Sequence, residues 1–236
     1  GTPLGCAVPG PRTRVTAGAN GIPIVSVAGA PRSTAANPQT CLVVGPKSGI
    51  TSSKDLPGKT LGVQTITRST HLGTQLWLKR AGVPYNSVKI VQVDGPAQAA
   101  QLASGRIDAV ETLAPFSTSV LKLGKSIIDP QASIAPEISG IFWAADRDWA
   151  TKHGVVLTCF QNSLVKATDF HKANAKKAKA ILQKQKKLPA DAVKSTVLAT
   201  YISDVRPADL TLWENAMKEV GGFKGDVSVA TLTLQH

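Results

Sequence analysis

Short buried strands alternate with amphipathic helices between Lys54 and Phe116. The strands carry Val and Ile with little alternation, which is typical of strands covered on both faces. Leu72 and Leu76 lie one turn apart and give the first helix an apolar stripe. Strands that alternate with helices indicate an α/β fold with a mostly parallel sheet, and such sheets bind ligands beyond the carboxyl ends of their strands. The predicted elements are strands over 61–63, 88–93 and 107–112 and helices over 71–80 and 96–105.

The flanking segments predict a second, discontinuous lobe. Strands are expected over 22–28, 40–44 and 138–144, and helices over about 159–187, 189–202 and 208–220. The segments before and after the middle unit must pack together to form a second lobe. This organisation indicates two lobes joined by two crossover strands. We place these near 42–47 and 137–145. Lobe 1 then comprises residues 1–45 and 140–236, lobe 2 comprises residues 46–139, and the ligand cleft lies between the lobes.

The turn after the first strand of lobe 2 is rich in hydroxyl groups and precedes a helix. The N-terminus of a helix carries free N–H groups and about half a positive charge, so it attracts anions. Arg68 adds a planar fork for a carboxylate, sulfonate or phosphate. In the alternative interpretation Ser69 or Thr70 only caps the helix and Arg68 points to solvent. The candidate ligand-binding residues of this turn are Thr67, Arg68, Ser69 and Thr70.

Acidic side chains follow the other two strands of lobe 2. Asp94 either caps the next helix or contacts an amine or hydroxyl of a ligand. Glu111 and Thr112, at the end of the third strand, face either the cleft or the hinge. A Glu111 carboxylate there repels unsuitable anions, accepts from a ligand donor or pairs with Arg68.

Lobe 1 contributes candidates at matching positions. These are Thr2 with Pro3, and Arg32 in the predicted turn after the strand 22–28. Arg32 is a candidate for a second anion clamp. The alternative is an exposed loop arginine.

Four segments carry a family resemblance. Lys54-Asp-Leu-Pro-Gly-Lys-Thr-Leu-Gly-Val63 resembles the opening of the second lobe in type II periplasmic binding proteins of the nitrate, sulfonate, taurine and thiamine-precursor branch. Ala81-Gly-Val83, the segment 99–109 (Ala-Ala-Gln-Leu-Ala-Ser-Gly-Arg-Ile-Asp-Ala) and Ala114-Pro-Phe116 are similar to later segments of that branch, in the same order and spacing.

The resemblance implies a solute-binding protein of an ATP-driven (ABC) importer. It implies a two-lobed type II fold, a periplasmic or otherwise extracytoplasmic location, a membrane permease with its ATPase as partner, no cofactor and a monomer. A small anion such as a sulfonate, nitrate or a carboxylate is the expected ligand. Relative to the family, we expect about sixty residues of lobe 1 to be absent ahead of Gly1-Thr-Pro3, which leaves apolar surface uncovered.

Two alternatives remain open. The ligand can instead be a thiamine-type pyrimidine or another aromatic heterocycle, which the same branch also binds. A function of another class is a ligand-sensing effector domain of a transcription regulator with a similar two-lobed fold. An adjoining DNA-binding helix pair would distinguish that class from a transport protein.

Composition agrees with an exported globular protein. The 236 residues are 42% hydrophobic, enough for a substantial core, and no apolar run reaches the roughly 18 residues that span a bilayer. The net charge of +12 arises partly from seven lysines between Lys172 and Lys187. We interpret these as the solvated back of a long helix whose core face comprises Phe160, Leu164, Ala167, Phe170, Ile181 and Leu182. Aromatic residues are scarce there, so a nucleic-acid partner is not expected.

Catalytic chemistry has little support in the sequence. No zinc-protease, nucleophile-elbow, phosphate-loop or paired-cysteine motif occurs. His71 stands beside Ser69 at a helix start, but no acid is placed to orient it, so we expect no enzyme and no metal. For Cys6, Cys41 and Cys159, three free thiols are the favoured interpretation, with a Cys6–Cys41 disulfide as the alternative.

Overall fold

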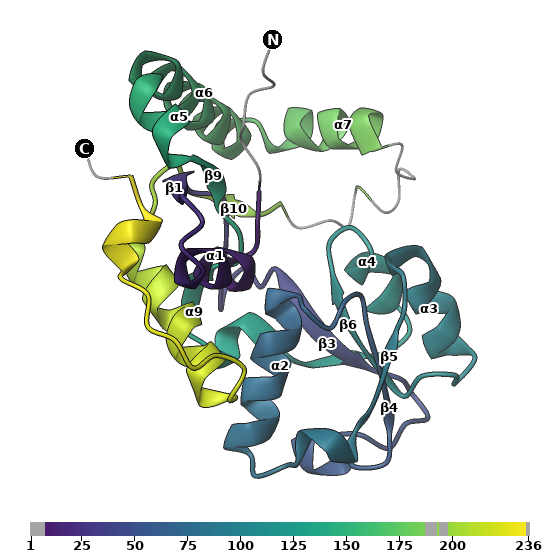
Figure 1. Ribbon diagram of the computed structural model, residues 1–236. Coiled ribbons are helices and arrows are strands. Elements are labelled where there is room, and N and C mark those ends of the chain that lie inside the picture. The colour runs from purple at the N-terminus through teal and green to yellow at the C-terminus, as the bar shows by residue number, and fades with distance from the viewer. Residues whose placement is uncertain (1–7, 187–192, 194–197, 235–236) are drawn as a thin grey trace. The chain divides into compact units, whose positions relative to one another are not determined.

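The computed structural model describes residues 8–186, 193 and 198–234 (Figure 1). Thr2 and Pro3 therefore lie outside the described residues. The chain divides into two compact units, each described here by itself. The first unit comprises residues 1–32, 138–178 and 199–236, and the second comprises residues 33–137 and 179–198.

A five-stranded mixed sheet forms the centre of the second unit. β4 is parallel to β5 and to β6, whereas β3 runs antiparallel to β6 and β7. The prediction of a mostly parallel arrangement is therefore correct for the three strands between 60 and 113. In sheet order the strands are β5 (Lys89–Gln92), β4 (Thr60–Val63), β6 (Ala109–Leu113), β3 (Thr40–Val44) and β7 (Lys125–Ile128).

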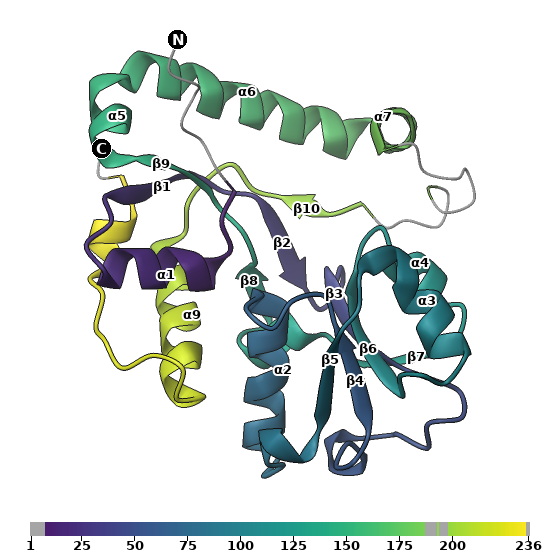
Figure 2. The same cartoon turned by 45° about the vertical axis from the view of Figure 1, so that its right-hand side comes forward.

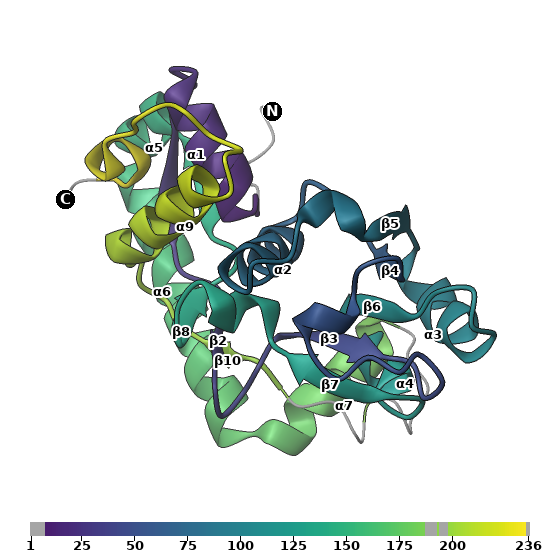
Figure 3. The ribbon, with the colours of Figure 1, turned by 90° about the horizontal axis from the view of Figure 1, so that it is seen from below.

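Helices cover both faces of this sheet (Figure 3). On one face Leu78 of α2 (Ser69–Arg80) packs with Leu42 and Leu61 of the sheet. On the other face Leu102 of α3 (Gly95–Ala103) and Val120 of α4 (Ser117–Val120) pack with strand residues, Val43 among them. The 3-10 helices of the unit are η1 (Ser53–Asp55), η2 (Tyr85–Ser87) and η3 (Pro130–Ser133).

The first unit contains a two-stranded antiparallel sheet of β1 (Ile24–Ala28) and β9 (Trp143–Asp146). Val25 and Val27 of β1 pack with Ala145 and with Leu157 of α6. Figure 2 shows α1 beside α9. The helices of the unit are α1 (Pro11–Ala19), α5 (Arg147–Lys152), α6 (Gly154–Ala173) and α9 (Pro207–Glu219), with the 3-10 helix η4 (Val229–Leu232).

The chain passes from one unit to the other at four places, and a small three-stranded sheet contains two of them. In this sheet β2 (Pro31–Thr34) lies between β10 (Thr200–Tyr201) and β8 (Glu137–Ser139). The units divide within β2, after Arg32, and within β8, after Glu137. The predicted lobe boundary at 45/46 differs from the first of these, because β3 is fully buried inside the sheet of the second unit.

Several predicted elements of the first unit differ from the structure. The predicted strand 138–144 is two strands, β8 and β9, and the long predicted helix is broken at Asn174 into α6 and α7 (Ala175–Lys186). The predicted helix 189–202 lies mostly outside the described residues, and Thr200 and Tyr201 near its predicted end form β10.

The predicted core face of the long helix is correct at Phe160, which packs against the core cluster of Val25, Val27 and Leu157. It is wrong at Phe170, which is 41% exposed, and at Ile181, which is 52% exposed. The predicted solvated face is correct at Lys172, Lys176 and Lys177, which are exposed.

Candidate ligand site

The three polar turns of the second unit gather at one edge of its sheet. Because β4, β5 and β6 are parallel neighbours, their carboxyl ends meet at that edge. The turns that begin at Gln64, Val93 and Ala114 follow these strands directly. This edge is the part of the second unit that we consider as a ligand site.

The turn after β4 presents an uncapped helix N-terminus. Arg68 occupies the N-cap position of α2 without a side-chain cap, so the prediction that Ser69 or Thr70 caps this helix is wrong. Thr67 and Arg68 are exposed, Ser69 is half-buried and Thr70 is buried. The N-terminus of α2 therefore lacks a side-chain cap, and the exposed Arg68 lies directly at it.

The turn after β5 has a similar arrangement with the opposite charge. Asp94 occupies the N-cap position of α3, yet its carboxylate accepts no capping hydrogen bond and is exposed. The prediction that this side chain caps the helix is therefore wrong. The edge presents an exposed carboxylate at one turn and an exposed guanidinium at the neighbouring one.

Glu111 lies inside the unit and is held by His71. The Nδ1 atom of His71 lies 2.7 Å from Glu111 Oε1, and its Nε2 atom lies 2.7 Å from the hydroxyl of Tyr85. His71 is fully buried and Glu111 is 3% exposed. The expectation that no acid orients His71 is therefore wrong. One of the roles predicted for Glu111 was an ion pair with Arg68, but its carboxylate instead contacts His71.

Glu111 also connects β6 to α3 through its backbone. Its carbonyl oxygen accepts a hydrogen bond of 2.9 Å from Nε2 of the fully buried Gln98. The neighbouring Thr112 is fully buried, and its hydroxyl has no hydrogen-bond partner among the described residues. Both predicted site residues on β6 therefore face the interior of the second unit in this structure.

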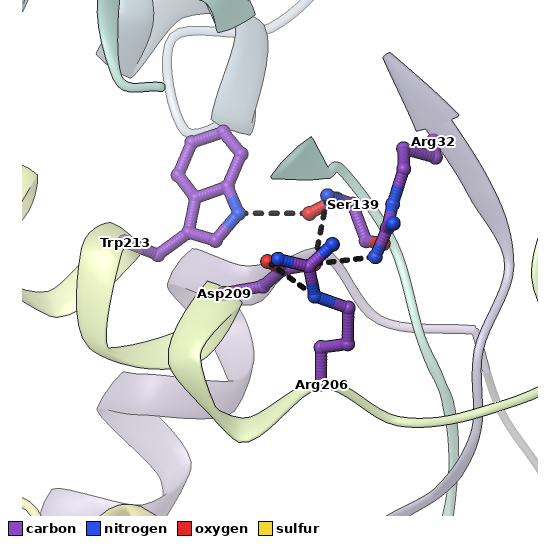
Figure 4. A network of polar contacts seen from close by, with 5 residues as sticks. All are labelled: Arg32, Ser139, Arg206, Asp209 and Trp213. Atoms are coloured by element: carbon purple, nitrogen blue, oxygen red, sulfur yellow. Dashed lines mark hydrogen bonds and ion pairs between the residues drawn. The ribbon is translucent and has the colours of Figure 1, made fainter. Parts of the chain in front are cut away.

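Arg32 lies in a strand of the first unit, so the interpretation as an exposed loop residue is wrong. The residue is 7% exposed, and its guanidinium lies 3.7 Å from the carboxylate of Asp209 (Figure 4). The Nε atom of Arg206 lies 3.8 Å from the other oxygen of the same carboxylate. The carboxylate of Asp209 therefore lies between two guanidinium groups and forms an ion pair with each.

A cavity of about 390 Å³ lies within the second unit. The register that pairs Thr40 with Leu113 places the start of β3 at the carboxyl end of β6, so the cavity lies at the edge with the polar turns. Neither this cavity nor a smaller one in the first unit is lined by Arg68, Asp94 or Glu111. Among the residues that line the larger cavity are Asn37, Thr40, Cys41, Ser117, Thr118 and Lys122.

Cys41 is a free, buried thiol at the wall of this cavity. Burial, with the charge of Asp129 adding to it, raises the pKa of Cys41 to about 12. Cys159 is free and exposed, and Cys6 lies outside the described residues. The alternative of a Cys6–Cys41 disulfide is therefore wrong. Within the same described ranges no group of three or more His, Cys, Asp and Glu is placed to hold a metal ion.

Comparison with known proteins assigns the family. A family model described as NMT1/THI5 like matches residues 6–193. The chain belongs to this family. It is also 31% identical over 131 residues to the taurine-binding periplasmic protein of Escherichia coli (strain K12). This alignment covers 54% of the chain but only 40% of the relative, so the chain spans less than half the length of that protein.

Solved structures of the same fold include two sulfonate-binding proteins. The periplasmic aliphatic sulphonate binding protein SsuA from Escherichia coli matches with a TM-score of 0.80 and 20% identity, over 98% of this chain and 75% of that one. The alkanesulfonate-binding protein SsuA from Xanthomonas axonopodis pv. citri, bound to MOPS, matches with a TM-score of 0.78 and 17% identity, over 97% and 80%. The desulfurization enzyme DSZB shares the fold as well, with a TM-score of 0.69 and 13% identity, over 97% of this chain and 82% of that one. The fold is therefore that of the type II periplasmic binding proteins, and it occurs with and without catalysis.

His71 and Gln98 are the residues that sequence reasoning missed. Glu111 lies 40 residues from His71 along the chain, and only the adjacency of β4 and β6 brings α2 against β6. No local motif marks such a pair. The sequence did indicate that α2 follows β4 and that β4 lies in the same sheet as β6. That arrangement does not specify which side chain of α2 contacts the carboxylate of Glu111.

Proposed function

We propose that the chain is an extracytoplasmic solute-binding protein that delivers a small anion to the permease of an ABC importer. The observation that carries this proposal is the family match over residues 6–193. It is supported by the helices α2 and α3, whose N-termini lack side-chain caps at one edge of the sheet. Such termini bind anions through free N–H groups and the helix dipole.

A sulfonate is the ligand class that the site suits best. Arg68 is exposed beside the N-terminus of α2, where its fork can donate two hydrogen bonds to a sulfonate. Glu111 is buried against His71, so its negative charge is kept away from the exposed edge. The relatives named above bind taurine, aliphatic sulfonates and alkanesulfonates, which supports the same class here.

The exposed carboxylate of Asp94 favours a ligand that carries an amine as well as an acid. Asp94 follows β5, the direct neighbour of the strand that leads to Arg68. Taurine carries an ammonium group and a sulfonate, so it can use a carboxylate and a guanidinium together. We therefore propose that taurine binds more tightly than ethanesulfonate, which lacks the ammonium group.

The partners and the location follow from the same proposal. A solute-binding protein of this kind acts outside the cytoplasm as a monomer and contacts a permease whose ATPase drives import. Its named relatives are periplasmic. Within the described residues, no helix combines the length and apolar character that crossing a membrane requires. The chain binds its solute without chemical conversion in this proposal.

A thermal-shift screen of the full-length protein tests the proposed ligand class. The panel comprises taurine, ethanesulfonate, nitrate, simple carboxylates and a thiamine-type pyrimidine. We expect the sulfonates to raise the midpoint of unfolding, with taurine above ethanesulfonate, since a ligand of the native state stabilises it by mass action. If only the pyrimidine raises the midpoint of unfolding, the proposed anionic ligand is wrong and the ligand is an aromatic heterocycle.

A further inference from the structure

One buried carboxylate of the first unit contacts β2 and β8, two strands in which the chain crosses between the units. Asp209, on the first turn of α9, is fully buried. One of its oxygens accepts a hydrogen bond of 3.1 Å from the backbone N–H of Ser139 in β8 and lies 3.7 Å from the guanidinium of Arg32 in β2 (Figure 4). A single side chain thus links segments that are far apart in the sequence.

Two side chains of α9 form hydrogen bonds with the backbone of Ser139, one with its N–H group and one with its carbonyl oxygen. The indole N–H of Trp213, one turn after Asp209, donates a hydrogen bond of 2.8 Å to the carbonyl oxygen of Ser139. Trp213 is fully buried, and so is Ser139. Side chains of one helix therefore bind both polar backbone groups of this strand residue, and losing either partner leaves a buried group unpaired.

Arg32 and Ser139 lie at two of the four points where the chain changes unit. Arg32 is the last residue of the first unit before Ser33, and Ser139 is the second residue after Glu137. On the side of the second unit, the hydroxyl of Ser33 donates a hydrogen bond of 2.7 Å to Asp129. Consecutive residues of β2 are thus bound to carboxylates of different units.

We propose that Asp209 is a hinge anchor, a positioning residue that fixes the crossing strands β2 and β8 to the first unit. At these two crossings, bending of the backbone is then confined to the links Arg32–Ser33 and Glu137–Ile138. Arg32 and Arg206 supply the positive charges that make a buried carboxylate tolerable at this place. The anchor goes beyond the proposed function, and its test uses no ligand, so its outcome does not depend on which solute binds.

Hydrogen exchange of the ligand-free protein tests the anchor. Asp209→Asn keeps an oxygen acceptor for Ser139 but removes the charge that holds Arg32. We expect at least tenfold faster amide exchange in β2, whose Arg32 loses the ion pair with Asp209, and little change in β8, where Ser139 keeps an acceptor. Glu214→Gln is the matched control, because Glu214 is a buried carboxylate of the same helix that bonds Val227 N–H at 3.2 Å and Lys218 at 2.9 Å. The control is expected to accelerate exchange near Val227 and to leave β2 and β8 unchanged.

A second measurement separates an anchor from a merely stabilising contact. Spin labels at Asp148 of α5 and Ala103 of α3, both exposed, report the distribution of distances between the units in a Cys6→Ser, Cys159→Ser background. We expect Asp209→Asn to broaden this distribution, whereas Glu214→Gln leaves its width unchanged.

Trp213→Phe keeps the proposal testable if Asp209→Asn fails to fold. This variant removes the N–H donor to Ser139 together with part of the buried ring, and it is expected to accelerate exchange in β8 while β2 stays protected. Unchanged exchange in β8 would overturn the proposal. So would an Asp209→Asn variant that folds and leaves the distance distribution as narrow as in the unsubstituted protein, or equal broadening in the Glu214→Gln control.

Discussion

His71 and Glu111 are 40 residues apart in the sequence, and their side chains meet at 2.7 Å in the interior of the second unit. The pair joins α2 to β6, and the contact of His71 with Tyr85 extends it to η2. The buried imidazole of His71 therefore connects α2, β6 and η2, the three elements that support the sheet edge with the candidate ligand site. The position of the turn after β4 depends on this contact, because His71 is the third residue of α2.

Removal of His71 is expected to destabilise the second unit strongly. His71→Leu leaves the buried carboxylate of Glu111 without its partner, so we expect a loss of about 3 kcal/mol in the free energy of unfolding. Tyr85→Phe removes only a hydroxyl and is expected to cost about 1 kcal/mol. Urea unfolding measures both variants. Equal stability of His71→Leu and the unsubstituted protein would show that the buried pair contributes nothing.

Arg68 is expected to contribute to anion affinity and not to stability. Because its side chain is exposed and lies at the N-terminus of α2, Arg68→Ala removes a charge-assisted contact without opening the core. We expect the Kd for a sulfonate to rise about 10- to 100-fold, which corresponds to about 1.5–3 kcal/mol. Titration calorimetry gives the Kd, and thermal unfolding confirms that the fold is retained.

Arg106→Ala is the matched control for Arg68. Arg106 is exposed too, but it precedes β6 and so lies at the opposite edge of the sheet from the polar turns. Its replacement is expected to leave the Kd unchanged. An equal loss of affinity in both variants would mean that Arg68 acts only through the overall charge of the protein.

Gly73 allows α2 to pack tightly against η3. A Cβ atom at this position would overlap the carbonyl oxygen of Pro130, which is backbone and cannot rotate away. We therefore expect Gly73→Ala to cost at least about 2 kcal/mol of stability, despite the higher helix propensity of alanine. Gly154→Ala, where a Cβ meets nothing within 4 Å, is expected to be neutral or slightly stabilising. Chemical denaturation followed by circular dichroism measures the free energy of unfolding of both variants. The comparison shows whether steric overlap with Pro130 or the helix propensity of alanine has the larger effect at position 73.

The two described cysteines are expected to differ sharply in reactivity. Burial and the charge of Asp129 raise the pKa of Cys41 to about 12, whereas Cys159 is exposed. At pH 8 only about 10⁻⁴ of Cys41 is thiolate, the form that reacts. In a Cys6→Ser variant, iodoacetamide should modify Cys159 and leave Cys41 untouched until denaturant is added, as mass spectrometry of the peptides would show. Comparable rates at the two sites in the native protein would contradict the buried position of Cys41.

Local pattern predicted the second unit better than it predicted the first. The strands β4 and β6 and the helix α2 between them follow from apolar runs, and their parallel pairing follows from alternation with helices. β3 was assigned to the other lobe, because its five buried residues show the same apolar run whether a strand crosses between lobes or lies inside one. Only the pairing with β6 and β7 distinguishes the two cases.

The contacts of the candidate residues depended on tertiary structure that the sequence does not display. Arg32 was expected in a turn after the strand 22–28, yet Pro31 pairs with Tyr201 of β10 and Arg32 lies within β2. Asp209 binds Ser139 across 70 residues, and no spacing rule connects them. In contrast, the turns at Arg68 and Asp94 were located correctly, since each directly follows a recognisable strand.

The most direct test of the account is a calorimetric titration of the full-length protein with taurine and with an uncharged sulfonamide of similar size. If two uncapped helix N-termini and Arg68 form an anion site, taurine binds with one site per chain, and the sulfonamide does not bind. Binding of the uncharged compound with equal affinity, or no heat with taurine, other sulfonates, nitrate and carboxylates, would contradict the proposal that this protein captures a small anion.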